Sequence, residues 1–260
     1  MDFTRITYAA GERRATITLN RPSKRNALDD ATVNELTTAF TMAGRDPSVK
    51  VILLEARGPA FSAGSDLEYL SRVSQYDLEQ NREDSIRLGQ LFRLIYELRK
   101  PVIALVDGPA LGEGAGLAAV CDFVIASKEN ARFAVPEVRL GFIPAVVLLF
   151  LLRRVGEGHA RALALRGEAI DGAEAYRIGL ANMVIPSAQL DATANALARE
   201  LIDKNSANAM GLCKEMLSKF QGLNLPEALD FAANMNAAAR MTAECKSGMG
   251  AFLRKEKIEW

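Results

Sequence analysis

The sequence is short of histidine, cysteine and net charge, and each shortage argues against a class of protein. Its 260 residues include one histidine, three scattered cysteines, and 32 basic residues balanced by 32 acidic ones. The lone His159 has no matching serine motif, which argues against a Ser-His-Asp hydrolase. The cysteines form neither a metal-type pair nor a disulfide framework, and zero net charge argues against a nucleic-acid partner. We therefore expect no metal site, no bound nucleic acid and a reducing cytoplasmic location.

Long apolar runs are also missing. The N-terminal residues 1–5 lack the apolar core of a signal peptide. The most apolar run, Ala145–Leu152, has eight residues, whereas a helix needs about 20 to cross a bilayer. We expect no membrane segment, and this run is either a buried helix or an oligomer contact.

Glycine, in contrast, is concentrated in one stretch, Val106–Gly116, which follows the apolar run Pro101–Val106. The stretch predicts a strand that turns sharply into a helix whose free N–H groups point outward. Such groups can bind an anion or stabilise negative charge on a substrate oxygen. A tight, close-packed turn is the simpler alternative. A dinucleotide fingerprint fits poorly, because Leu117 stands where its last glycine should be.

Hydrophobic periodicity predicts strands alternating with helices, and then helices alone. The predicted strands are 3–9, 14–19, 49–55, 101–106, 121–126 and 131–135. The predicted helices are 30–45, 66–72, 77–98, 145–155, 157–166, 173–178, 187–204 and most of 206–260, with a break at 222–226. The charged face of 77–98 is expected to be solvated. This order indicates an α/β core over residues 1–190, with a mostly parallel sheet, and a helical region over 191–260.

Blocks of sequence spread over nearly the whole chain resemble the crotonase (enoyl-CoA hydratase/isomerase) superfamily. In order they are 19–28, 60–67, 106–122, 135–144 and 173–180. The resemblance implies a crotonase-like spiral of ββα units with a C-terminal helical region that covers the site and builds a homotrimer or homohexamer. It also implies an acyl-CoA thioester as substrate, with coenzyme A as part of that substrate and no separate cofactor.

The resemblance places an oxyanion hole at two backbone N–H groups, those of Ser65 and Glu113. A thioester becomes enolate-like when it reacts, and two preorganised donors stabilise the charge on its oxygen. Glu113 departs from the family, which has glycine there. Its N–H remains available, and its side chain either points away to pair with a cation or enters the pocket as an acid, base or substrate contact. A distorted or inactive site is the third alternative.

The resemblance also implies that Glu137 is catalytic, whereas Gly116 stands where many family members carry a second glutamate. One carboxylate suits a Δ3,Δ2-enoyl-CoA isomerase. However, residues 137–145 and 151–156 look more like bacterial hydratases of the methylglutaconyl-CoA type, which often carry glycine at that position. Hydration of a 2-enoyl-CoA is therefore favoured, with isomerisation or non-catalytic acyl-CoA binding as alternatives.

Coenzyme A contacts follow from the same resemblance. Lys24 and Arg25 would meet phosphates, or would form a solvated basic turn. Asp66 would contact the ligand by its backbone, cap the following helix, or do both. The full set of further contacts is Ala27, Ala63, Gly64, Asp66, Leu67 and Gly112. The acyl chain stays undetermined, because its pocket lies in the variable residues 67–98 and the helical region.

Overall fold

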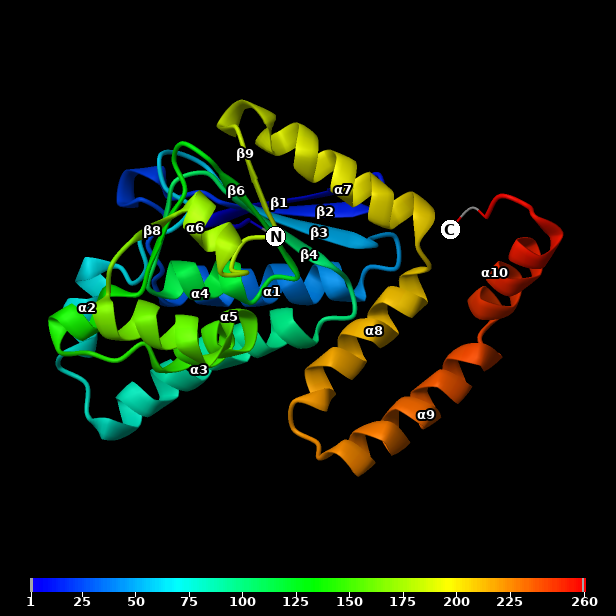
Figure 1. Ribbon diagram of the computed structural model, residues 1–260. Helices are drawn as coiled ribbons and strands as arrows, with labels where there is room; N and C mark the ends of the chain where they lie inside the picture. The colour runs from blue at the N-terminus through cyan, green and yellow to red at the C-terminus, as the bar shows by residue number, and fades with distance from the viewer. Residues whose placement is uncertain (1, 259) are drawn as a thin grey trace.

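The computed structural model describes residues 2–258 and 260, and contains two sheets surrounded by helices (Figure 1). The larger sheet has the order β1-β2-β3-β4-β6-β9, and the smaller has the order β5-β7-β8. Within the larger sheet β1 and β2 are antiparallel and the other pairs are parallel. The strands are β1 (Ile6–Gly11), β2 (Arg14–Leu19), β3 (Val51–Ala56), β4 (Val102–Val106), β5 (Pro109–Leu111), β6 (Phe123–Ser127), β7 (Arg132–Ala134), β8 (Ile170–Asp171) and β9 (Met183–Ile185).

Helices cover both faces of the larger sheet, and the alternation of buried side chains along β3 shows why. Ile52 and Leu54 face the core shared with α1, α3, α4 and α5, whereas Val51 and Leu53 face α7. Figure 1 shows the same layers, with α7 on one side of the sheet. The helices are α1 (Asp30–Arg45), α2 (Leu67–Val73), α3 (Leu78–Glu97), α4 (Glu113–Ala119), α5 (Ala145–Arg166), α6 (Gly172–Arg177) and α7 (Leu190–Lys204), with short 3-10 turns η1 (Pro22–Lys24), η2 (Pro136–Leu140) and η3 (Ser187–Gln189).

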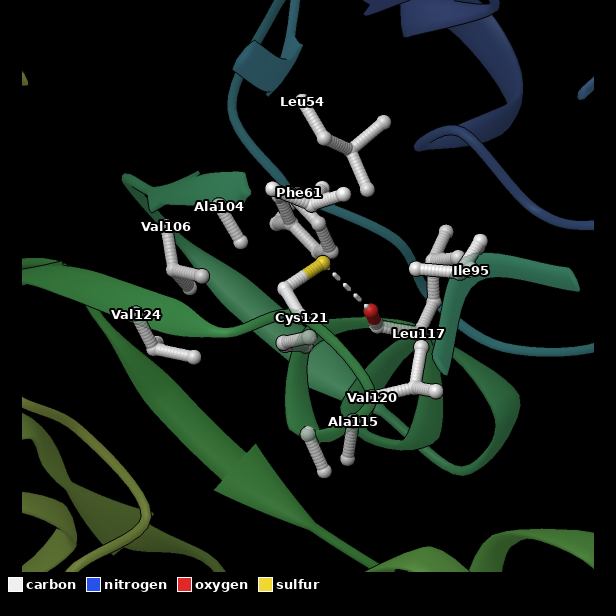
Figure 2. Close-up of a cluster of buried hydrophobic side chains, with 14 of the residues drawn as sticks. Leu54, Phe61, Ile95, Ala104, Val106, Ala115, Leu117, Val120, Cys121 and Val124 are labelled. Carbon is white, nitrogen blue, oxygen red and sulfur yellow. Dashed lines mark hydrogen bonds between the residues drawn. The ribbon is translucent and has the colours of Figure 1, made fainter. Parts of the chain in front are cut away.

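Cys121 lies in the core that joins α4 to the sheet. Its side chain is packed among Leu54, Phe61 and Leu117 (Figure 2), and its Sγ–H donates to the carbonyl oxygen of Leu117 at 3.2 Å. Burial raises the pKa of this thiol to about 12, so it stays protonated and inert. Cys121 therefore serves packing, and this core fixes α4 behind the glycine stretch.

The C-terminal helices extend away from the body of the molecule (Figure 1). They are α8 (Ala207–Phe220), α9 (Leu225–Met241) and α10 (Ala243–Arg254). No residue of α9 is buried. Its exposed apolar side chains include Leu225 and Leu229, and Phe252 of α10 is 78% exposed. The region thus presents apolar surface that the rest of the described chain does not cover.

The predicted α/β class with a C-terminal helical region is confirmed, and the differences are local. Strands β5, β8 and β9 have two or three residues, too few to carry a periodic signal. The two helices predicted over 145–166 form one element, interrupted at Gly156, whose φ is 75°. The boundary between 190 and 191 stays a prediction, although α7 beyond it packs on the sheet. None of the described helices combines the length and hydropathy that a bilayer-spanning segment requires.

Candidate active site

Two loops, one carrying Ser65 and the other Glu113, are held side by side by backbone contacts. The N–H of Leu111 donates to the carbonyl oxygen of Ser62 at 2.9 Å. Gly64 has a φ of +86°, and a Cβ there would lie 2.8 Å from the Leu111 carbonyl oxygen and 3.7 Å from the Glu113 nitrogen. Only a glycine allows this conformation and this approach together. The structure therefore brings the two predicted donors together at a glycine contact.

The N–H groups of Ser65 and Glu113 are both available to a ligand. Ser65 lies between the Gly64 contact and α2, and Glu113 is the first residue of α4, where an N–H has no partner within the helix. Neither N–H has an acceptor among residues 2–258. Because backbone N–H groups require partners, this pair is suited to hold an oxygen that gains negative charge.

Glu137 lies on η2 with its carboxylate against the first glycine of the run. A Cβ on Gly112 would lie 2.8 Å from Glu137 Oε1, so this glycine, with a φ of 51°, makes room for the carboxylate. Glu137 Oε2 is buried without a hydrogen-bond partner among the described residues. Burial raises the pKa of Glu137, and a hydrogen bond from its own backbone offsets part of this effect. The described residues therefore leave this carboxylate oxygen free to accept a hydrogen bond from a bound molecule.

The side chain of Glu113 faces a small cavity of about 20 Å³, bounded also by Leu28, Tyr69 and Asp84. The surroundings together raise the pKa of Glu113 to about 7: burial is the main cause, the Ser65 side chain opposes it, and the charges of Asp84 and Glu137 add to it. Among the ion pairs of the described residues none involves Glu113. The structure thus favours the alternative in which this side chain belongs to the site, over pairing with a cation.

Three residues at this cavity were not predicted from the sequence. The Tyr69 hydroxyl donates to Asp84, and Arg87 Nη2 lies 3.1 Å from Asp84 Oδ1 and 3.8 Å from Asp30 Oδ1. Asp84 and Arg87 lie on α3, on the charged face that we expected to be solvated. Arg82 and Glu83 on that face are exposed, as expected, whereas Asp84 and Arg87 are half-buried at their contacts with Tyr69 and Asp30.

Gly116, the position of the missing second glutamate, is closed by packing. A Cβ there would lie 2.7 Å from Cε2 of Phe92 and 2.8 Å from Cγ2 of Val147. Both neighbours are core side chains. The position therefore has no space for a carboxylate that reaches substrate.

A glutamate introduced at position 116 is expected to destabilise the fold rather than to supply a catalytic group. Gly116→Glu should lower the free energy of unfolding by about 3 kcal/mol or more, because it overpacks the core and buries a charge. Gly89→Glu is the matched control, since Gly89 is also in a helix but a Cβ there meets nothing within 4 Å. Urea unfolding of both variants checks this; equal stabilities would contradict the packing argument.

Asn26 explains the Arg-Pro-x-x-x-Asn part of the first block. It is 2% exposed with a φ of 53°, and its Nδ2 donates to the carbonyl oxygens of Arg57 and Ala60, both at 2.8 Å. Its Oδ1 accepts the N–H of Arg21 at 2.8 Å. Asn26 therefore ties the first block to the loop that leads to Ser65, and its role is to position that loop.

Asp66 caps α2, as one of its predicted roles requires. It accepts the N–H groups of Glu68 at 2.9 Å and Tyr69 at 3.3 Å, and Arg21 Nη2 lies 3.1 Å from its Oδ2. Burial alone would raise the pKa of Asp66, but these hydrogen bonds and the guanidinium hold it below its usual range. Its carboxylate is thus committed to structure, and a ligand contact through its backbone stays a prediction.

The predicted coenzyme A residues lie around the same loops. Lys24 is exposed, and its Nζ lies 2.6 Å from Glu68 Oε1. Arg25 is exposed, and its carbonyl oxygen accepts the N–H of Ala63 at 2.9 Å. Leu67 is 82% exposed. The remaining residues, Ala27, Gly64 and Gly112, are buried.

A cavity of about 680 Å³ lies away from these loops. It is bounded by residues of α7, α8 and α10, among them Leu201, Met210 and Cys245. It contains none of the predicted site residues. We attribute this cavity to the uncovered surface of the C-terminal helices. Its volume alone does not identify a ligand site, because a site also needs convergent polar groups.

The comparisons with known proteins all indicate the same family. A family model described as enoyl-CoA hydratase/isomerase matches residues 11–260. A Thermus thermophilus protein provisionally named an enoyl-CoA hydratase is 39% identical, over 93% of this chain and 94% of its own. The crotonyl-CoA hydratase of Syntrophomonas wolfei is 34% identical, over 100% and 99%. A Mycobacterium smegmatis structure titled as an enoyl-CoA hydratase superposes with a TM-score of 0.93 at 30% identity, over 99% of each chain.

Proposed function

Because the chain belongs to the enoyl-CoA hydratase/isomerase family, we propose that it adds water across the double bond of a 2-enoyl-CoA. The observation that carries this proposal is the buried, unpartnered Oε2 of Glu137 beside the two free N–H groups of Ser65 and Glu113. The names of the relatives as hydratases support it. The proposal needs no metal and no redox cofactor, and coenzyme A enters as part of the substrate.

One carboxylate is enough to balance the protons of this reaction. The thioester oxygen accepts hydrogen bonds from Ser65 and Glu113. Glu137 takes one proton from water as the water oxygen bonds to the β-carbon, and the π electrons move to the thioester oxygen as an enolate. Glu137, now protonated, then returns that proton to the α-carbon as the carbonyl re-forms. Water is added in full, and Glu137 ends as it began.

The environment of Glu137 suits this double role. Burial raises its pKa toward the working pH, so the carboxylate is a better base and its acid a usable donor. Its free Oε2 leaves one lone pair for water without breaking an existing hydrogen bond. Glycine at position 112 leaves space for the other oxygen, because a Cβ there would lie 2.8 Å from Oε1.

The single carboxylate also supports a second candidate, a Δ3,Δ2-enoyl-CoA isomerase. Glu137 would then remove a proton from the α-carbon of a 3-enoyl-CoA and return it to the γ-carbon, with the same N–H pair holding the enolate. A non-catalytic acyl-CoA-binding protein is the third candidate. The three differ in what happens to the mass and the double bond of the ester.

Mass spectrometry of CoA esters in deuterated water separates these candidates. The panel is crotonyl-CoA, a 3-enoyl-CoA and 3-methylglutaconyl-CoA, each incubated with the purified chain. Gain of one water by a 2-enoyl ester supports the hydratase. Conversion of the 3-enoyl ester to its 2-enoyl isomer without added water supports the isomerase. Binding of the esters with neither change nor deuterium uptake contradicts both enzymatic candidates.

We also propose that further copies of this chain cover the C-terminal helices, giving a trimer or a pair of trimers in a reducing cytoplasm. The exposed apolar residues of α9 and α10 and the cavity of about 680 Å³ beside α8 support the assembly. The three cysteines are free thiols, which supports the compartment.

Light scattering after size-exclusion chromatography checks the assembly. We expect a mass of three or six times the 28.2 kDa chain. Leu229→Glu on α9 should reduce that mass, because it places charge on surface that a neighbouring copy buries. Leu165→Glu on α5 is the control, since Leu165 is similarly exposed (69% against 62%) but outside the C-terminal helices. A monomeric wild type would contradict the proposal.

A further inference from the structure

The residue that donates the second N–H also carries an acidic side chain, which the family's glycine lacks. The Glu113 carboxyl lies close enough to the side chain of Ser65, the other donor, for that side chain to influence its pKa. It also lines the cavity of about 20 Å³ beneath α2 and α3. A carboxyl group therefore lies beside both donors.

The groups that face Glu113 are mostly acidic. Asp84 comes from α3 and Glu137 from η2, and both act on Glu113 as negative charges. Tyr69 of α2 is nearly buried, and its hydroxyl is committed to Asp84. Asp30 of α1 and Asp29, which caps α1, also line this cavity. Both are paired with arginines: Asp29 with Arg5 and Arg21, and Asp30 with Arg72 and Arg87.

Arg87 is the one cation that lines this cavity, within the part of the chain that the structure describes. Its guanidinium is taken by Asp84 and Asp30. It does not pair with Glu113, so no cation offsets a negative charge there. Burial, together with the charges of Asp84 and Glu137, disfavours an ionised Glu113 and raises its pKa to about 7.

An ionised Glu113 would also oppose the chemistry. Negative charge develops on the thioester oxygen between Ser65 and Glu113, and a carboxylate close to it would repel that charge. A neutral carboxyl avoids this repulsion and presents an O–H dipole instead, as neutral carboxylic acids do in other oxyanion holes.

We propose that Glu113 works as a neutral carboxylic acid bordering the oxyanion hole, and that its ionisation inactivates the site. The inference rests on the proposed function, since it takes the oxygen held by the two N–H groups to be that of a reacting thioester. It assigns a role to the side chain by which this site departs from the family's glycine run.

The test is the pH dependence of kcat/KM for crotonyl-CoA between pH 5.5 and 9.5, for wild type, Glu113→Gln and Glu113→Gly. Wild type should lose activity about tenfold per pH unit above the pKa of Glu113, close to 100-fold by two units above it. Glu113→Gln keeps a neutral side chain of the same shape, so its activity should change less than about threefold over that alkaline range. Asp84→Asn should move the wild-type loss to lower pH, because one of the charges that disfavour ionisation is removed.

Infrared difference spectra between wild type and Glu113→Gln report the proton on this carboxyl without any turnover. The band of the protonated acid should vanish as pH rises through about 7. Three results would each overturn the inference. They are a loss of kcat/KM at alkaline pH that persists in Glu113→Gln, no such loss in wild type, and ionisation of Glu113 near the ordinary value of 4.5. Wild type that turns over none of the esters would overturn the proposed function instead, and the infrared result would still show whether Glu113 is neutral.

Discussion

Glu137→Gln is expected to lower kcat for hydration by about 10² to 10⁴-fold, the range for removing a general acid–base group. The amide keeps the shape of the side chain but cannot take a proton from water. KM should change little, because the thioester oxygen is held by the N–H groups of Ser65 and Glu113. Steady-state kinetics on the ester that the wild type hydrates, with kcat and KM determined separately, give the measurement.

The stability of the same variant distinguishes a functional carboxylate from a structural one. Glu137 Oε2 has no partner among the described residues, and burying an unpaired charged oxygen costs free energy. Glu137→Gln should therefore unfold at the same or a higher temperature than wild type. Glu35→Gln is the contrast, because Glu35 accepts backbone N–H groups from Thr4, Arg5 and Ile6 and its loss should lower the melting temperature.

Retention of kcat in Glu137→Gln would remove the basis of the proposed mechanism. Glu113 would then be the remaining carboxyl beside the donors, and its own substitution would have to abolish turnover. A Glu137→Gln variant that loses kcat but also melts earlier would show that the carboxylate serves the fold, which would leave the unpartnered oxygen unexplained.

The elements that the sequence predicts well are those with a local physical cause. The helix at 30–45 is found as α1, because Asp29 caps its N-terminus by accepting the Thr32 N–H at 2.8 Å and Leu36, Phe40 and Ala43 form its buried side. The strand β2 follows from its alternation. Each signal lies within a few residues, so no knowledge of distant contacts is needed.

The contacts that define the site join residues far apart in the chain, and these contacts could not be predicted from the sequence. Tyr69, Asp84 and Glu113 come from three separate elements and meet at one small cavity. Nothing in the charge pattern of residues 77–98 separates Asp84 from its solvated neighbours. The family resemblance locates Glu137 and the two donors, but it gives no direction for a side chain that the family's glycine lacks.

The reason for Gly116 is equally invisible in the sequence. Read alone, the absence of a glutamate there could mean a lost activity or a different reaction. The structure shows Phe92 and Val147 filling that space, so the core and the single-carboxylate site are consistent with each other. One carboxylate suits both reactions, so the choice between hydration and isomerisation depends on where a water molecule can bind beside Glu137.

Gly64→Ala is expected to lower kcat by about 10² to 10³-fold, the loss that follows removal of an oxyanion-hole donor. The new Cβ would lie 2.8 Å from the carbonyl oxygen of Leu111, which is backbone. Neither the Cβ nor this backbone oxygen can rotate away, so the loop that carries Ser65 and the loop that carries Glu113 must separate. The two N–H groups would then no longer converge on one oxygen, and kinetics together with a thermal melt would measure both consequences.

Gly179→Ala is the matched control for this effect. Gly179 has a φ of +85°, against +86° for Gly64, but its nearest neighbour to a new Cβ is the Arg154 carbonyl oxygen at 3.9 Å. Both variants carry the backbone penalty of about 1 to 2 kcal/mol for a side chain in this region, and only Gly64→Ala adds the contact between the loops. If kcat falls equally in both, the loss comes from general destabilisation. If it falls only in Gly64→Ala, the spacing of the two donors is what the glycine contact preserves.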